Sequence, residues 1–442
     1  MKTTWTLHIE NFAKIKTANI KISPLMCFVG DNNSGKSYLM SLLWGLLTFG
    51  SEIFPKAPSD SKVYKNCEDW LRNNWMRENI ELDSEVSLMY INWFNELLAN
   101  SRKALVKRIF NYDIDIDKIS INDYYCSQNR KILWSDKIVY IHSKSTSIAL
   151  PVNDKPTREA LLVANIYICW DILMSEFTAP YNKQFVKGNG INKPVYLPAS
   201  RTGFMLTFPM LLESSFQVTF SAMAENSSVL TAPYVSFLQL ITKFGTKRKS
   251  SRFSELIKFI EKDMTNGSIN AKKEMLPDIK YQPTGSDKDI PLYVSSSVVS
   301  EVSALTLLLK SNTIFKTIII EEPEAHLHPN LQQKIAKLII NLMNMGIQVW
   351  ITTHSDTILQ HINNMLKLSA HDKSKELMQE FNYTEKDLLK ISQVSMYQFT
   401  TADNTHTKLD ELTADKYGFV IPTFNNALEK LVKEVYAFQE VN

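Results

Sequence analysis

A glycine-rich segment near the start of the chain has the residue types and spacing of a phosphate-binding loop. It fits the pattern G-x-x-x-x-G-K-[ST] and consists of Gly30, Asp31, Asn32, Asn33, Ser34, Gly35, Lys36 and Ser37. In such a P-loop, backbone N–H groups at a helix N-terminus hold the phosphates, the lysine reaches the β- and γ-phosphates, and the hydroxyl ligates Mg²⁺. The sequence therefore predicts a nucleotide site for ATP or GTP, with Ser37 as a metal ligand.

Two adjacent carboxylates follow a second apolar run much later in the chain. Ile318, Ile319 and Ile320 precede Glu321 and Glu322, which is the arrangement of a Walker B element. Glu321 is expected to hold Mg²⁺ directly or through water, and Glu322 to polarise the attacking water. Taken alone, the pair is equally compatible with a solvated strand end.

A histidine after the next apolar run favours the catalytic interpretation. His354 follows Trp350, Ile351, Thr352 and Thr353, at the end of the strand expected beside the Walker B strand. An imidazole there can contact the γ-phosphate. Glu322 and His354 are therefore the predicted catalytic residues.

The elements around these motifs alternate between strand and helix. Residues 5–30 predict an antiparallel hairpin leading into the P-loop strand, and 38–48 a helix. Residues 317–320 and 349–352 are expected to be buried strands on either side of a helix over 331–345, and residues 295–310 a serine-rich turn running into a helix. This pattern predicts an α/β fold with a parallel sheet whose catalytic groups lie at the carboxyl ends of the strands.

The rest of the chain divides by composition. We expect the N-terminal lobe of an ATPase head over 1–50 and a mostly helical insertion over 51–190, whose aromatic residues recur at helical spacing. A C-terminal lobe of the head follows over 191–365, with a helical part at about 205–290, and residues 366–442 form a C-terminal tail region.

Composition and charge exclude few partners, but they favour a cytoplasmic protein that does not associate with membranes. The chain has 442 residues, 44% of them hydrophobic, and a formal net charge of +3, which neither demands nor excludes nucleic acid. Four cysteines without C-x-x-C spacing favour a reduced, cytoplasmic compartment. The longest apolar run, 160–174, contains Asn165 and Asp171, so no membrane association is expected.

Taken in order, the motifs resemble those of ABC/SMC/RecF-type ATPases, and most closely the OLD-like and related AAA-family ATPases of bacterial anti-phage systems. The resemblance rests on the P-loop and on five further segments. These are Ile9-Glu10-Asn11-Phe12, Tyr196-Leu197-Pro198-Ala199-Ser200-Arg201-Thr202-Gly203, Ser295-Ser296-Ser297-Val298-Val299-Ser300-Glu301, Glu321-Glu322-Pro323-Glu324-Ala325-His326-Leu327-His328-Pro329 and Thr352-Thr353-His354-Ser355. It covers roughly residues 1–50 and 190–365 and implies ATP and Mg²⁺ as cofactors, together with a head whose mixed sheet carries an N-terminal antiparallel hairpin.

The resemblance also implies that two heads sandwich two nucleotides. Ser296 or Ser297 corresponds to the signature serine that reaches the γ-phosphate held by a second subunit, and residues 324–328 to the dimer-facing D-loop. A homodimer or larger homo-oligomer is therefore expected. The sequence departs from the family pattern in lacking the signature glycine and in having Glu321 where an aspartate is usual. His326 and His328 are alternatively a metal pair, although no third ligand of suitable spacing accompanies them.

Three functions remain open at this point. The first is an ATP-hydrolysing sensor or scaffold of a defence system that controls a separately encoded effector, a nuclease or toxin. The 88 residues after His354 contain no Asp-x-Asp run behind an apolar strand, so a nuclease domain of the OLD type is not expected in this chain. The second is a RecF/SMC-like DNA-repair ATPase, for which two basic clusters are candidates: Lys243, Lys247, Arg248, Lys249 and Arg252, and Arg102, Lys103, Lys107 and Arg108. The third is a nucleotide-gated interaction platform with negligible turnover.

Overall fold

The structure of the protein is a computed structural model. It covers residues 3–77, 80–126, 130–132, 138–140, 149–151, 155–174, 176–177, 193–208, 230–245, 252–272, 277–401, 406–415, 418–420 and 431–438. Within these ranges no helix is both long enough and apolar enough to cross a membrane.

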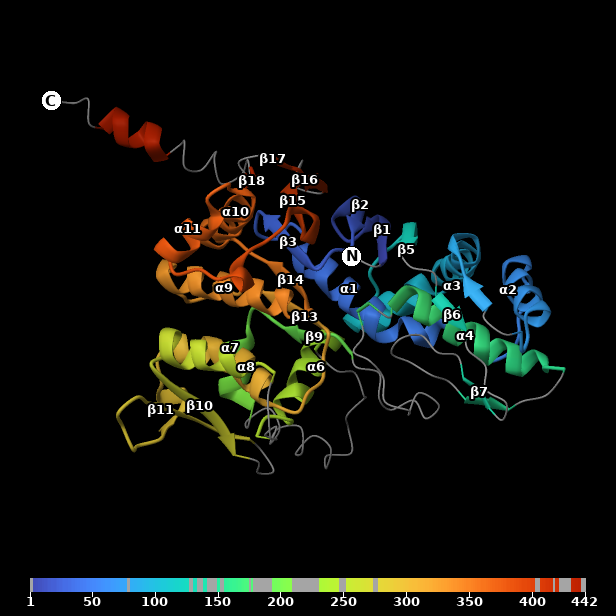
Figure 1. Ribbon diagram of the computed structural model, residues 1–442, viewed down its shortest axis with the longest axis horizontal. Helices are drawn as coiled ribbons and strands as arrows, with labels where there is room; N and C mark the ends of the chain where they lie inside the picture. The colour runs from blue at the N-terminus through green and yellow to red at the C-terminus, as the bar shows by residue number, and fades with distance from the viewer. Residues whose placement is uncertain are drawn as a thin grey trace.

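A mixed nine-stranded sheet forms the centre of the molecule (Figure 1). Its strands, in spatial order, are β5 (Lys118–Cys126), β1 (Thr3–Phe12), β2 (Ile15–Lys21), β16 (Thr407–Leu412), β15 (Val394–Thr401), β3 (Leu25–Gly30), β14 (Gln348–Thr352), β13 (Thr317–Glu321) and β9 (Val195–Leu197). The five strands from β15 to β9 are parallel, and β1 pairs with both β2 and β5 in antiparallel register. This arrangement confirms the predicted α/β class with an N-terminal antiparallel hairpin.

The central strands are apolar throughout because both of their faces are covered. Along β3, Met26 and Phe28 belong to one hydrophobic core, whereas Leu25, Cys27 and Val29 belong to a second. A strand that contributes to a core on each face has a continuous apolar sequence rather than a polar–apolar alternation. The sheet is therefore the middle layer of a three-layer fold.

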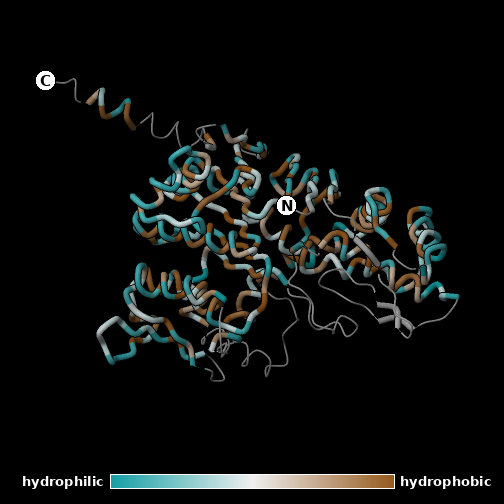
Figure 2. The backbone as a smooth tube through the Cα atoms, viewed as in Figure 1, coloured by the Kyte–Doolittle hydropathy of each residue, from teal (hydrophilic) through white to brown (hydrophobic). Residues whose placement is uncertain are grey.

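Helices cover the two faces of this sheet. The helices of the described residues include α1 (Lys36–Phe49), α2 (Lys62–Asn73), α3 (Ser84–Phe110), α4 (Arg158–Met174), α6 (Ala232–Ile241), α7 (Ser254–Phe259), α8 (Ser297–Lys310), α9 (Pro329–Asn344), α10 (Asp356–Ala370) and α11 (Ser374–Glu380). The first core includes α1 to α4, and the second includes α6 to α10. Figure 2 shows alternating brown and teal along the helices, as expected for elements with one buried face.

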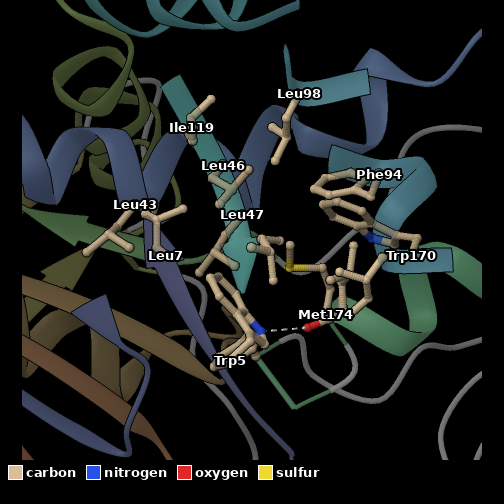
Figure 3. Close-up of a cluster of buried hydrophobic side chains, with 14 of the residues drawn as sticks. Trp5, Leu7, Leu43, Leu46, Leu47, Phe94, Leu98, Ile119, Trp170 and Met174 are labelled. Atoms are coloured by element: carbon tan, nitrogen blue, oxygen red, sulfur yellow. Dashed lines mark hydrogen bonds between the residues drawn. The ribbon is translucent and has the colours of Figure 1, made fainter. Parts of the chain in front are cut away.

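The first core joins the P-loop helix to the segment between residues 51 and 190. Leu43 and Leu47 of α1, Phe94 of α3 and Trp170 of α4 lie in one buried cluster with Trp5 of β1 (Figure 3). The Trp5 indole donates a hydrogen bond of 3.4 Å to the carbonyl of Leu173. The helices of this segment are thus part of the head's own core.

Four small sheets complete the described part of the fold. They are β10 (Gly267–Lys272) with β11 (Asp278–Pro283) and β12 (Ile290–Pro291), β4 (Ile80–Leu82) with β6 (Arg130–Ile132), β7 (Ile138–Tyr140) with β8 (Ala149–Pro151), and β17 (Ala414–Asp415) with β18 (Gly418–Phe419). Their strands lie partly in regions expected to be helical, and the domain boundaries themselves stay predictions.

Several central elements agree closely with the sequence-based expectations, and others do not. Helices α1, α8 and α9 and strands β13 and β14 are confirmed within a few residues. However, β5 lies in the segment 51–190 that is expected to be mostly helical, and β15 and β16 lie in the segment 366–442 that is expected to be a tail region. These strands form by pairing with distant parts of the sheet, which local periodicity does not report.

A buried histidine on α10 makes the stability of the fold depend on pH. His361 is 3% exposed, and neither ring nitrogen has a hydrogen-bond partner among the described residues. Burial lowers its pKa to about 4, and Asp387 opposes this shift while Lys337 adds to it. Because the unfolded chain takes up this proton near pH 6.5 and the folded chain only near pH 4, stability falls as the pH drops between these values.

We therefore expect the wild-type protein to lose up to about 3 kcal/mol of stability between pH 6.5 and pH 4 through this one residue. His361→Gln removes the titration, so its thermal midpoint should fall less steeply over that range. Scanning fluorimetry of both proteins from pH 7.5 to pH 4.5 measures the difference. Parallel curves would mean that His361 does not carry the effect.

Candidate nucleotide-binding and hydrolysis site

The P-loop connects β3 to α1 at the carboxyl edge of the parallel strands (Figure 1). Gly30 has φ 131° and Gly35 has φ 98°, conformations that favour glycine. A Cβ atom on Gly30 would also lie 2.1 Å from the carbonyl oxygen of Phe399 in β15. The two glycines of the motif are therefore required by backbone conformation and, at Gly30, by close packing.

Lys36 lies at the start of α1 and folds back over the loop. Its ammonium donates to the carbonyl oxygens of Gly30 at 3.0 Å and Asp31 at 2.6 Å, and lies 3.4 Å from the Ser34 hydroxyl. Burial lowers its pKa to about 8, although Glu322 and the other nearby carboxylates oppose this shift. A desolvated cation of this kind is suited to phosphate oxygens, which would replace the carbonyls as acceptors.

Glu321 ends β13 and is only 1% exposed. One carboxylate oxygen accepts a 3.2 Å hydrogen bond from the amide of Ala199, while the other is buried without a hydrogen-bond partner in the described part of the chain. A buried oxygen with unused lone pairs fits a ligand of a hard cation. Glu321 and the exposed residue Ser37 thus have the chemistry of the predicted Mg²⁺ ligands.

Glu322 follows β13 in a left-handed conformation, with φ 43°. Its backbone N–H donates to the carbonyl of Thr352 at 3.0 Å. Thr352 of β14 is the register partner of Glu321 in β13. Unlike Glu321, it has a side chain that is 44% exposed. The turn therefore buries the first carboxylate and presents the second.

His354 lies two residues beyond β14, and its ring faces Glu322. The distance from His354 Nε2 to Glu322 Oε1 is 3.9 Å. Burial, followed by the charge of Lys36, lowers the pKa of His354, so the imidazole is neutral near pH 7. The structure thus brings Glu322, His354 and the P-loop lysine together at one edge of the sheet.

Glu324 has a place in this site that the sequence did not predict. One of its carboxylate oxygens accepts hydrogen bonds from the Thr353 hydroxyl at 2.8 Å and from the backbone N–H of His354 at 2.6 Å. Burial raises its pKa. Although the resemblance assigns Glu324 to a dimer-facing loop, its side chain turns inward and holds the segment that carries His354.

The predicted signature serines lie on a different element from the P-loop. Ser297 is the first residue of α8 and Ser296 is its N-cap, and both are exposed. The Ser296 side chain makes no capping hydrogen bond to the described first turn of α8. Their hydroxyls are thus presented at a helix start, and their role toward a second nucleotide stays a prediction.

The two histidines of the alternative metal pair have other partners. His326 Nδ1 lies 3.3 Å from a carboxylate oxygen of Glu301, and the His328 ring accepts from the backbone N–H of Asn330 at 3.4 Å. Among the described residues no group of three or more His, Cys, Asp or Glu side chains could hold a metal ion.

The two basic clusters considered for nucleic acid differ in how far the structure describes them. In the cluster on α3, Lys107 pairs with Asp113 at 2.9 Å and Arg108 pairs with Glu52, which reduces its positive field. In the other cluster, residues 247–249 lie outside the described residues. Nucleic-acid binding stays a prediction.

A protein-family model described as an AAA ATPase domain matches residues 5–173 and 215–359. These ranges contain the P-loop, Ser296, Ser297, Glu321, Glu322 and His354. No curated protein matches the chain.

Solved structures of SMC heads are similar over nearly the full length. An SMC head bound to the C-terminal winged-helix domain of ScpA is 14% identical, with 93% of this chain and 98% of that chain covered and a TM-score of 0.39. The SMC head domain from Thermotoga maritima is 10% identical, with 93% and 100% covered and a TM-score of 0.36.

Proposed function

Because the chain belongs to the family of AAA ATPase domains, we propose that it binds ATP with Mg²⁺ at the P-loop and hydrolyses it. The observation that carries this proposal is the approach of Glu322 to His354, with Lys36 facing the same carboxylates. Lys36 and the loop amides would bind the phosphates, and Ser37 and Glu321 would hold Mg²⁺. The metal would neutralise charge that develops on the phosphate oxygens.

The remaining groups fit the transfer of the γ-phosphoryl group to water. The exposed carboxylate of Glu322 would orient the water and accept its proton, and neutral His354 would donate a hydrogen bond toward the γ-phosphate. We propose further that two heads associate and that Ser296 or Ser297 of one head contacts the nucleotide of the other. The exposure of both residues at the start of α8 supports this.

For the biological role, we propose a sensor or scaffold of a bacterial anti-phage system that controls a separately encoded effector. This role is supported by the resemblance of residues 321–329 and of the other motif segments to OLD-like ATPases. Phages should form fewer plaques on a strain that expresses the chain with its neighbouring genes than on a strain in which the chain carries Lys36→Ala. Equal plaque numbers across a broad phage panel, together with sensitivity to DNA damage in the variant, would favour the RecF/SMC-like repair role instead.

A further inference from the structure

A buried guanidinium lies directly behind the two carboxylates of the candidate site. Arg201, which follows β9, has a side chain that is 4% exposed. Its Nη1 donates to the backbone carbonyl of Glu321 at 2.7 Å, and its Nη2 donates to that of Glu322 at 3.1 Å. One side chain therefore binds both peptide groups of the Walker B turn.

The counter-ion of Arg201 comes from the helix that begins with the signature serines. Glu301 of α8 has a side chain that is 1% exposed, and it forms an ion pair with Arg201. Its second oxygen accepts the Thr202 hydroxyl at 2.5 Å and lies 3.3 Å from His326 Nδ1. A buried charge pair of this kind costs desolvation energy and is weak evidence for stability by itself.

The conformation of Glu322 requires support from its surroundings. A left-handed φ of 43° is unfavourable for a residue with a Cβ atom and persists only where neighbouring groups hold it. The Glu322 N–H donates to the carbonyl of Thr352 and lies 3.2 Å from its hydroxyl, and the Glu322 carbonyl accepts from Arg201 at 3.1 Å and from the Ala325 N–H at 3.0 Å. The peptide groups on both sides of its Cα are thus fixed, which sets the direction of the carboxylate.

We propose that Arg201 and Glu301 are positioning residues that hold Glu322 in its left-handed conformation, with its carboxylate directed toward His354. The proposal rests on the proposed hydrolysis of ATP. Arg201 acts through the Glu321 and Glu322 carbonyls, and Glu301 acts by orienting Arg201. Without the pair, the Glu321 and Glu322 carbonyls lose the guanidinium that joins them and the Glu322 carbonyl keeps only the bond from Ala325. The turn then relaxes, and the Glu322 carboxylate leaves the position from which it orients water.

The test is the double variant Arg201→Met/Glu301→Leu, which replaces the buried pair by apolar side chains of similar size. We expect kcat for ATP to fall about 100-fold, the cost typical of misplacing a catalytic group by about 1 Å. ATP affinity should stay within about threefold, because the P-loop contacts are untouched. The matched control is Lys310→Met/Glu261→Leu, which removes a 2.6 Å ion pair at the other end of α8 and should leave kcat within about twofold.

Hydrogen exchange of the Glu322 amide supplies a readout that needs no turnover. It should accelerate in the Arg201/Glu301 variant and not in the control, because the N–H bond to Thr352 depends on the held conformation. Wild-type protein without ATPase activity would refute the proposed function, yet the exchange experiment would still decide the positioning role. Normal kcat and unchanged exchange in the folded variant would overturn that role.

Arg201→Lys keeps the buried charge if the double variant does not fold. A lysine cannot reproduce the guanidinium's simultaneous bonds to two carbonyls. We expect it to reduce kcat with little change in ATP affinity and to accelerate exchange at Glu322. Wild-type values of both quantities in folded Arg201→Lys would contradict the proposal.

Discussion

Glu322→Gln is expected to lower ATP turnover by about 10²-fold or more while ATP stays bound. The amide keeps the size and shape of the side chain but cannot accept a proton from water. The P-loop and Glu321 are unchanged, so the affinity for Mg²⁺-ATP should stay close to that of the wild type. Phosphate release and equilibrium binding, measured on the same preparations, separate the two quantities.

The control and a second readout make this prediction specific. Glu376→Gln, which changes an exposed glutamate on α11, should hydrolyse ATP normally. Trapped Glu322→Gln should also form more head-to-tail dimer when ATP is added, as measured by light scattering. Normal turnover in Glu322→Gln would reverse or refute the roles given to the two acids, and a monomer with and without ATP would refute the role of Ser296 and Ser297.

Lys36→Ala is expected to weaken ATP binding by about 100-fold or more, because it removes the only P-loop cation that faces several phosphate charges. The fold should survive, since the substitution removes an ammonium that burial already disfavours, as its lowered pKa of about 8 shows. Mg²⁺-ATP should therefore raise the thermal midpoint of the wild type but not that of the variant.

Lys65→Ala is the matched control for Lys36→Ala. Lys65 lies on α2, is 51% exposed and pairs with Asp60 at 3.4 Å, so its loss should leave ATP affinity within about twofold. Unchanged ATP affinity in Lys36→Ala would show that the P-loop does not bind the nucleotide. Equal losses of ATP affinity in both variants would indicate a general electrostatic effect.

The residues of the candidate nucleotide site could be predicted from the sequence because each of their motifs is a short, continuous segment. Each of the P-loop, Glu321–Glu322 and His354 follows an apolar run, and parallel strands bring their carboxyl ends to one edge. Arg201 and Glu301 could not be assigned a role in this way. Their bonds join residues about a hundred positions apart in the chain. The only signal in the sequence was the resemblance of the segments 196–203 and 295–301, which contain Arg201 and Glu301.

The same limit applies to the sheet. Strands β13 and β14 were predicted from their own composition, whereas β5, β15 and β16 are defined by partners elsewhere in the chain. A half-exposed strand such as β16 carries no continuous apolar run, so its pairing with β15 and β2 is a property of the whole fold.

Strands β15 and β16 are synthesised long after β2 and β3, yet they lie between these two strands in the sheet. Only residues 22–24 separate β2 from β3 in sequence. The hairpin half and the P-loop half of a nascent chain therefore stay unjoined until residues 394–412 have emerged from the ribosome. Because Gly30 packs against Phe399, the nucleotide site is also completed only at that stage. The proposed nucleotide site is therefore expected to form late in translation, after the long-range pairings of the sheet.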